Sequence, residues 1–179
     1  MANEILHKVG TPVVFADSTD YSSTGSGFTR TAQILLESVA NAAARQSDKV
    51  DLGATRARMY SVLVGIEFGT APTAGGLVEF YWSASHSATA GTGNDAGAGG
   101  SDAAYKAAEE DEWKKQAILM GVLVVTNDGA GTVQRQTIGY FTPPERYGQV
   151  IVVNKAGQTF DTDSTQMYVA LVPMVDEVQ

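Results

Sequence analysis

The chain has 179 residues, a formal net charge of −8 and no cysteine. Nucleic-acid binding needs a basic surface that neutralises phosphates, and this acidic balance provides none. The lack of cysteine excludes disulfides, thiolate catalysis and cysteine-type zinc sites. Hydrophobic residues make up 44% and there are 19 glycines, which favours one globular domain with many turns and therefore β structure.

No segment approaches the roughly 20 apolar residues that a membrane-spanning helix needs. The apolar run Pro12–Phe15 is too short to be the core of a secretory signal. We therefore expect no membrane partner. The absence of cysteine is consistent with folding in a reducing cytoplasm.

Residues 1–30 are expected to form an extended N-terminal arm. Their short apolar pieces are followed by a run from Asp17 to Gly27 that is rich in Ser, Thr, Asp and Gly and has little to bury. Two interpretations stay open: an ordinary disordered terminus, and an arm that packs on a neighbouring subunit. In the second, deletion of residues 1–30 weakens assembly but leaves the domain at residues 31–179 folded.

Residues 31–46 fit two structures. Ile34, Leu35 and Val39 lie on one helical stripe, and the alanines of the segment favour a helix. A strand near Gln33–Val39 that leads into the sheet is preferred, because everything that follows has β character.

The next two segments alternate as strands do. Between Arg58 and Phe68 every even-numbered residue from Tyr60 onward is apolar, and Leu77–Ser83 places Val78, Phe80 and Trp82 on one face. A loop with paired glycines joins the two segments. The pattern therefore predicts a β-hairpin between them.

The segment Ser83–Asp102 consists almost entirely of Ala, Gly, Ser and Thr. A loop of this length inside a compact domain is usually functional or flexible. It has few titratable side chains, so a catalytic role is not favoured. Its small side chains allow close backbone approach, which favours contact with a neighbouring subunit over a solvent-facing ornament.

Residues 101–115 predict one or two helical turns, capped by Ser101 or Asp102. Glu110 and Lys114 are four residues apart and are expected to pair. The four consecutive carboxylates at 109–112 point around a helix, so they indicate a solvated face more than a metal site.

Further strands are predicted at 118–126, 132–141, 150–153 and 166–174. The first is apolar on both faces, which suggests a central or covered strand, and Pro173 is expected to mark the end of the last strand or a sheet edge. Together these segments predict an all-β fold. It is expected to be an antiparallel β-sandwich of jelly-roll type, with about eight strands and one short helix, preceded by the arm.

Sequence motifs that would indicate nucleotide or metal binding are weak. Gly91–Ala96 matches the loose dinucleotide pattern G-x-G-x-x-A, but the glycines that follow cannot open a helix to hold pyrophosphate. Asp161 and Asp163 begin like a calcium loop. However, an EF-hand would require Gly and Glu where Gln166 and Val172 stand, so a polar turn is predicted, with a weak calcium contact as the alternative.

The only histidines, His7 and His86, lie in polar segments and are expected to be solvated. Serines flank His86, but a triad also needs rigid geometry and an orienting acid. A pair of carboxylates for glycoside cleavage stays open, since such pairs are assembled in space. We assign no catalytic, cofactor-binding or metal-binding residue, and expect neither enzymatic activity nor a cofactor.

Several strand and turn segments carry a family likeness. They are ARQSDKVDLG at 44–53, GGLVEFYW at 75–82, GTGN at 91–94, YFTPPERYG at 140–148 and YVALVPMVDEV at 168–178. Together they resemble small virion structural proteins of tailed bacteriophages. Proteins of this kind often act as capsid decoration, or cement, proteins that sit on the capsid exterior as trimers.

The resemblance implies a non-enzymatic decoration protein on the outside of the virion, assembled in the host cytoplasm. Its partners would be the major capsid protein and further copies of itself, with a trimer favoured, and neither nucleic acid nor membrane. One alternative is a neck, tail or baseplate component. Another is a carbohydrate-binding module for host recognition, with Trp82, Tyr105 or Trp113 exposed as a platform for sugar rings.

Overall fold

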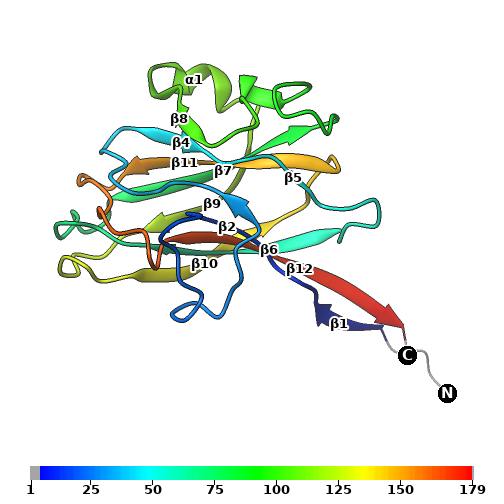
Figure 1. Ribbon diagram of the computed structural model, residues 1–179, viewed down its shortest axis with the longest axis horizontal. Coiled ribbons are helices and arrows are strands. Elements are labelled where there is room, and N and C mark those ends of the chain that lie inside the picture. Colours follow the sequence, from blue (N-terminus) through cyan, green and yellow to red (C-terminus); the bar gives the residue numbers. More distant parts are fainter. Residues whose placement is uncertain (1–4, 179) are drawn as a thin grey trace.

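The computed structural model describes residues 5–178 and is a sandwich of two six-stranded sheets (Figure 1). Sheet A contains β1 (Ile5–Val9), β2 (Val13–Ala16), β3 (Ala32–Gln33), β6 (Met59–Ile66), β10 (Gln134–Phe141) and β12 (Tyr168–Val178). Sheet B contains β4 (Ala44–Gln46), β5 (Val50–Asp51), β7 (Leu77–Ser85), β8 (Ala103–Tyr105), β9 (Ile118–Val124) and β11 (Tyr147–Lys155). The expected all-β sandwich with one short helix, α1 (Glu110–Trp113), is confirmed.

Sheet A has the order β10–β6–β12–β2–β3. β1 pairs with the last part of β12, residues 174–178, which follows the part that pairs with β2. Sheet B has the order β8–β4–β11–β7–β9, and β5 pairs with β11. All pairs are antiparallel except β2 with β3. The described chain has more strands than the eight expected, because β1, β3, β5 and β8 are short pieces without a clear alternating signal.

The core lies between the two sheets. Its largest fully buried side chains include Trp82 and Phe80 of β7 and Phe15 of β2. The ring of Trp82 meets Phe15 edge-on at 6.5 Å and lies 5.5 Å from the ring of Phe141. Burial of these large apolar side chains is the main stabilising contribution, at about 25 cal/mol per Å² of apolar surface removed from water.

The predicted hairpin between β6 and β7 is wrong. β6 pairs with β10 and β12 in sheet A, whereas β7 pairs with β11 and β9 in sheet B. Both strands bury their apolar faces, so the loop between them carries the chain across the core and sets those faces opposite each other. Alternation identified the strands, but it holds no information on which strand each one pairs with.

The predicted arm contains a strand of the sandwich. β2 pairs with β12 over residues 169–171 and places the side chain of Phe15 in the core. The polar run after β2 folds back over the outer face of sheet A, where Tyr21 and Phe28 pack against the ring of Tyr168. The side chains that hold this segment were too widely spaced to give a periodic signal.

Residues 31–46 form neither a helix nor one continuous strand. They contain the short strands β3 and β4, joined by an irregular segment that buries Ile34, Leu36 and Val39 in the core. Ser38 and Ala42 have φ of 53° and 63°, left-handed values that interrupt any regular element.

Pro173 does not end the last strand, which continues to Val178. Its carbonyl accepts a hydrogen bond from the Gly10 N–H. Because the N–H and C=O of a strand residue point to the same side, the missing N–H of Pro173 faces the break between β1 and β2, where no ladder bond is lost. β9 is an edge strand of sheet B, not a central one, and Leu119 and Val124 lie exposed on it.

Apart from β8, which pairs with β4 at the edge of sheet B, the segment between β7 and β9 forms a third layer over that sheet (Figure 1). It contains two 3₁₀ turns, Asp95–Gly97 and Ala107–Glu109, together with β8 and α1. Its buried side chains, Ala96, Ala98, Tyr105 and Trp113, pack on Tyr81, Ile151 and Val153 of sheet B. We call residues 86–117 the insert.

Candidate functional site

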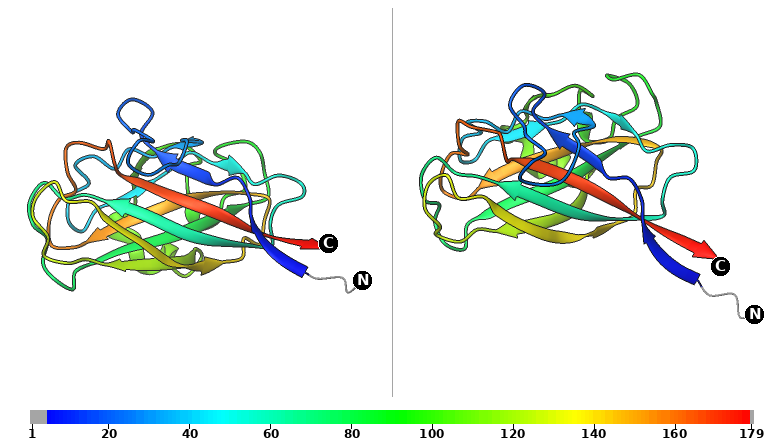
Figure 2. Two further views of the ribbon diagram at one scale, coloured as in Figure 1. Left: turned by 90° about the horizontal axis from the view of Figure 1, so that it is seen from below. Right: turned by 60° about the horizontal axis from the view of Figure 1, so that its bottom comes forward.

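The first candidate feature is the terminal ribbon, formed by β1 and the end of β12. Ile5 pairs with Val178 and Val9 with Met174. β6 accompanies β12 only as far as Met174, so beyond that point the two strands leave the sandwich together (Figure 2). The start of β1 and the end of β12 thus lie at the tip of one projection.

The terminal ribbon exposes apolar side chains. Val9 is 66% exposed on β1 and Val175 is 40% exposed on β12. Among residues 5–178, no strand pairs with the outer edge of β1, and none pairs with the outer edge of β12 beyond Met174. Unpaired strand edges present rows of N–H and C=O groups that can receive another strand.

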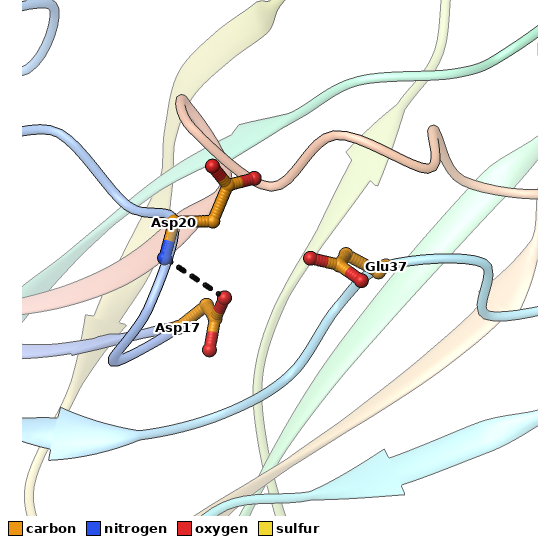
Figure 3. A group of neighbouring side chains, drawn as sticks. All are labelled: Asp17, Asp20 and Glu37. Carbon is orange, nitrogen blue, oxygen red and sulfur yellow. Dashed lines mark hydrogen bonds between the residues drawn. The ribbon is translucent and has the colours of Figure 1, made fainter.

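A second feature is a group of three converging carboxylates from Asp17, Asp20 and Glu37 (Figure 3). One oxygen from each lies within 4.8 Å of the others. Carboxylate oxygens of this kind are ligands for hard cations such as Ca²⁺. The sequence offers a calcium contact only as an alternative at Asp161 and Asp163, and it gives no signal for these three carboxylates, because Glu37 lies apart from Asp17 and Asp20 along the chain.

These carboxylates share hydrogen-bond donors from the chain itself. The hydroxyl of Ser164, which is 1% exposed, lies 3.2 Å from Asp17 Oδ2, 3.4 Å from Asp20 Oδ2 and 3.1 Å from Glu37 Oε1. Asp17 also accepts hydrogen bonds from Gln33 Nε2, Thr19 Oγ1 and the Asp20 N–H. The group therefore acts as a polar cross-link between β2, the segment before β4 and the loop before β12.

Burial raises the pKa of Asp17, but hydrogen bonds from Gln33, Thr19 and Ser164 outweigh it and lower the pKa to about 2. A carboxylate whose pKa is depressed on folding stabilises the fold above its unfolded pKa of about 4, and this contribution is lost as the pH falls towards 2. We expect Asp17→Asn to lower the free energy of unfolding by about 2 kcal/mol at pH 7 and by progressively less below pH 4.

Urea unfolding across this pH range measures the effect. Glu112→Gln, at an exposed position on α1, is the matched control and should change little at any pH. A constant difference between Asp17→Asn and the native chain down to pH 3 would show that the charge of Asp17 is not the source of its contribution.

The insert is anchored by the ammonium group of Lys49. Lys49 Nζ lies 3.0 Å from Ser85 Oγ, and 3.0, 2.7 and 3.0 Å from the carbonyl oxygens of Ser87, Thr89 and Thr92. Four oxygens, three of them loop carbonyls, thus surround the ammonium group. Burial lowers the pKa of Lys49. No local sequence signal connects this lysine to a loop some forty residues away.

The end of the long loop is fixed by Asp102, which was expected to cap a helix. Its carboxylate accepts hydrogen bonds from Arg45 at 2.8 and 2.5 Å and from the Leu35 N–H. The capping prediction is wrong, because β8 follows directly and the helical turns start only at Ala107. The expected pair between Glu110 and Lys114 is confirmed, with 2.6 Å between Oε2 and Nζ.

Replacement of Lys49 by Met is expected to loosen residues 86–94 while the sandwich stays folded. The substitution keeps the length of the side chain but leaves four oxygens without the cation, which costs about 1–3 kcal/mol of local stability. Hydrogen exchange of the amides in 86–94 should rise sharply. Lys115→Met, at an exposed position, is the control, and equal exchange in both variants would contradict the anchoring role.

The serine and histidine residues do not form a triad. His86 is exposed, while Ser83 donates to the Asp95 carbonyl and Ser85 donates to the carbonyls of Ser87 and Thr92. The glycine pattern at 91–96 leads into a three-residue 3₁₀ turn, and β8 follows that turn. These residues serve the folding of the insert.

The three aromatic residues named for the alternative carbohydrate-binding module do not form an exposed platform. Trp82, Tyr105 and Trp113 are 0%, 8% and 2% exposed. Trp82 lies in the core, and the other two meet edge-on at 5.1 Å between the insert and sheet B. Tyr105 donates a hydrogen bond to the Ala96 carbonyl, and Trp113 donates one to the Lys106 carbonyl.

No protein-family model matches the chain, and the comparisons with characterised proteins and with solved structures gave no match. Within the described residues, no helix is long and apolar enough to cross a bilayer. The likeness to small virion proteins of tailed bacteriophages therefore stays a prediction from the sequence.

Proposed function

We propose that this chain is a non-enzymatic structural protein of a tailed bacteriophage virion, and specifically a capsid decoration protein. Its role would be to bind the major capsid protein on the outside of the head and to stabilise the shell. The sequence resemblance, which spans most of residues 44–178, supports this role, and so does the net charge of −8, which disfavours contact with packaged DNA.

A jelly-roll topology is part of the proposal. Apart from the short strands β1, β3, β5 and β8, one sheet has the order β2–β12–β6–β10 and the other β4–β11–β7–β9. Eight strands in two such sheets, with the chain crossing repeatedly from one sheet to the other, agree with the jelly-roll pattern of two Greek keys. Viral capsid proteins use this architecture repeatedly, although fold alone does not assign a function.

The terminal ribbon is the observation that carries the proposal. A two-stranded ribbon is marginally stable on its own in water. This one projects from the sandwich with Val9 and Val175 exposed and with strand edges open. Such a structure is expected in a protein whose work is to join other proteins, because strand edges provide affinity through main-chain hydrogen bonds.

The test is binding to undecorated heads of the phage that encodes the chain. The purified protein should bind at micromolar concentration and saturate in a fixed ratio to the capsomers. The matched variant lacks residues 1–10, which removes β1 but keeps β2, and it should bind at least tenfold more weakly. Absence of binding to heads, or binding to isolated tails instead, would overturn the capsid assignment.

A further inference from the structure

The loop between β9 and β10 carries the dipeptide Asp128–Gly129, the only place in the sequence where a glycine follows an aspartate or an asparagine. The backbone nitrogen after an aspartate is held by the chain close to the side-chain carboxyl carbon, so attack by that nitrogen is an intramolecular reaction. Glycine favours the attack because it has no side chain to obstruct the approach. Whether the reaction proceeds in the folded protein depends on the freedom of the two groups.

The ends of this loop are fixed to the sandwich. The buried side chain of Gln134 accepts a hydrogen bond from the Thr126 N–H and donates one to the Thr126 carbonyl, both at 2.9 Å. The Gly131 N–H donates to the carbonyl of Phe68 at 3.0 Å. Between these two attachments, residues 127–130 are exposed and belong to no strand or helix.

The two reacting groups lie in this free part of the loop. Among residues 5–178, the carboxylate of Asp128 is hydrogen-bonded only to the hydroxyl of Thr126, and no hydrogen bond involves the Gly129 N–H. A β-carbon on Gly129 would meet nothing within 4 Å, so no neighbouring atom restrains the turn at this residue. Exposed segments with so few contacts sample many backbone conformations, including those that bring nitrogen and carboxyl together.

Two other aspartates precede a small residue, serine, but the fold holds both pairs. The N–H of Ser164, which follows Asp163, donates to Asp20 Oδ2 at 2.9 Å, and Ser164 is 1% exposed. The buried carboxylate of Asp17 accepts hydrogen bonds from four groups of the fold, so it is not free to turn towards the Ser18 nitrogen. The structure therefore separates one free pair from two restrained ones.

We infer that Asp128–Gly129 is a site of spontaneous isoaspartate formation in the folded protein. The Gly129 nitrogen attacks Cγ of the protonated Asp128 carboxyl group and forms a C–N bond. One carboxyl oxygen leaves as water, taking the carboxyl proton and the Gly129 amide proton. The product is a cyclic succinimide, which is lighter than the native chain by one water molecule.

Water then opens the succinimide ring at one of its two carbonyl carbons. Opening at Cγ restores aspartate, whereas opening at the main-chain carbonyl carbon of Asp128 gives isoaspartate, in which the main chain runs through the former side chain. The second step takes up the water that the first released, so no co-reactant is needed. The added main-chain carbon lies between the attachments at Thr126 and Gly131, and we expect the sandwich to stay folded.

Peptide mapping of the full chain, aged for weeks at neutral pH and physiological temperature, tests the inference. Trypsin releases residues 116–135 as one peptide in which Asp128 is the only aspartate. This peptide should separate into two chromatographic peaks of equal mass, and electron-transfer fragmentation should assign isoaspartate to position 128. The peptides that contain Asp17 and Asp163 should stay unmodified. Gly129→Ala, the matched control, should slow the reaction several-fold, because its β-carbon obstructs the attack.

A second sample, aged in guanidinium chloride, separates the effect of the fold from that of the sequence. Unfolding removes the hydrogen bonds at Asp17 and Ser164, so isoaspartate should now form at Asp17 and Asp163 as well. Isomerisation at Asp128 only in the denatured sample would overturn the inference, and so would equal rates at Asp128 and Asp163 in the folded chain. A product of residues 116–135 that is heavier than the native peptide would place the reaction at Asn127 and would also overturn it. None of these outcomes depends on the proposed role in the virion.

Discussion

A chain that lacks residues 1–30 is expected to be unfolded, whereas a chain that lacks residues 1–10 is expected to keep the native fold. The longer deletion removes β2, which pairs with β12 and fills the core with Phe15. Loss of a buried phenylalanine side chain alone costs about 3–5 kcal/mol, against a total stability of about 5–15 kcal/mol for an ordinary domain. The deletion also removes Asp17, which links β2 to Gln33 and Ser164.

Far-ultraviolet circular dichroism and thermal unfolding distinguish the two chains. The point variant Phe15→Ala separates the core contribution from the effect of shortening, and it should lower the free energy of unfolding by about 3–5 kcal/mol. A cooperative transition in the chain without residues 1–30 would show that the sandwich does not need β2. That result would restore the interpretation of residues 1–30 as a dispensable arm.

Gly148→Ala is expected to cost about 3 kcal/mol, a large effect for one added methyl group. Gly148 lies in β11 directly under the indole of Trp82, and a β-carbon there would overlap the ring. The ring has little room to move, since Trp82 is fully buried and in contact with Phe15 and Phe141. Either β11 must shift or the core must repack.

Gly129→Ala is the matched control, because a β-carbon at Gly129 meets nothing within 4 Å. Chemical denaturation of the two variants compares the same substitution in the core and in open space. The free energy of unfolding should stay within about 0.5 kcal/mol of the native value for Gly129→Ala. Equal stabilities would show that the indole of Trp82 adapts easily, contrary to the packing described here.

The sequence predicts strands well where apolar and polar residues alternate within one short segment. Tyr60 to Phe68 and Val78 to Trp82 predicted strands that the structure contains, because a half-buried strand must alternate. Pairing is a property of distant segments. The loop between β6 and β7 had the composition of a hairpin turn, yet it joins the two sheets.

Contacts between distant residues explain the other differences. Lys49 binds carbonyls 38 to 43 residues away, and Asp102 binds Arg45 57 residues away. Those contacts turn a segment of small residues into an ordered layer over sheet B. The contacts of the three carboxylates with Ser164 could not be predicted from the sequence either, since Ser164 lies 127 residues from Glu37 and 147 from Asp17.

Electron cryomicroscopy of native phage particles, compared with particles made without this chain, tests the proposed function most directly. The proposed function predicts density on the outer surface of the capsid that disappears when the chain is absent. Identical capsids in the two preparations, with a difference at the neck or tail, would contradict it.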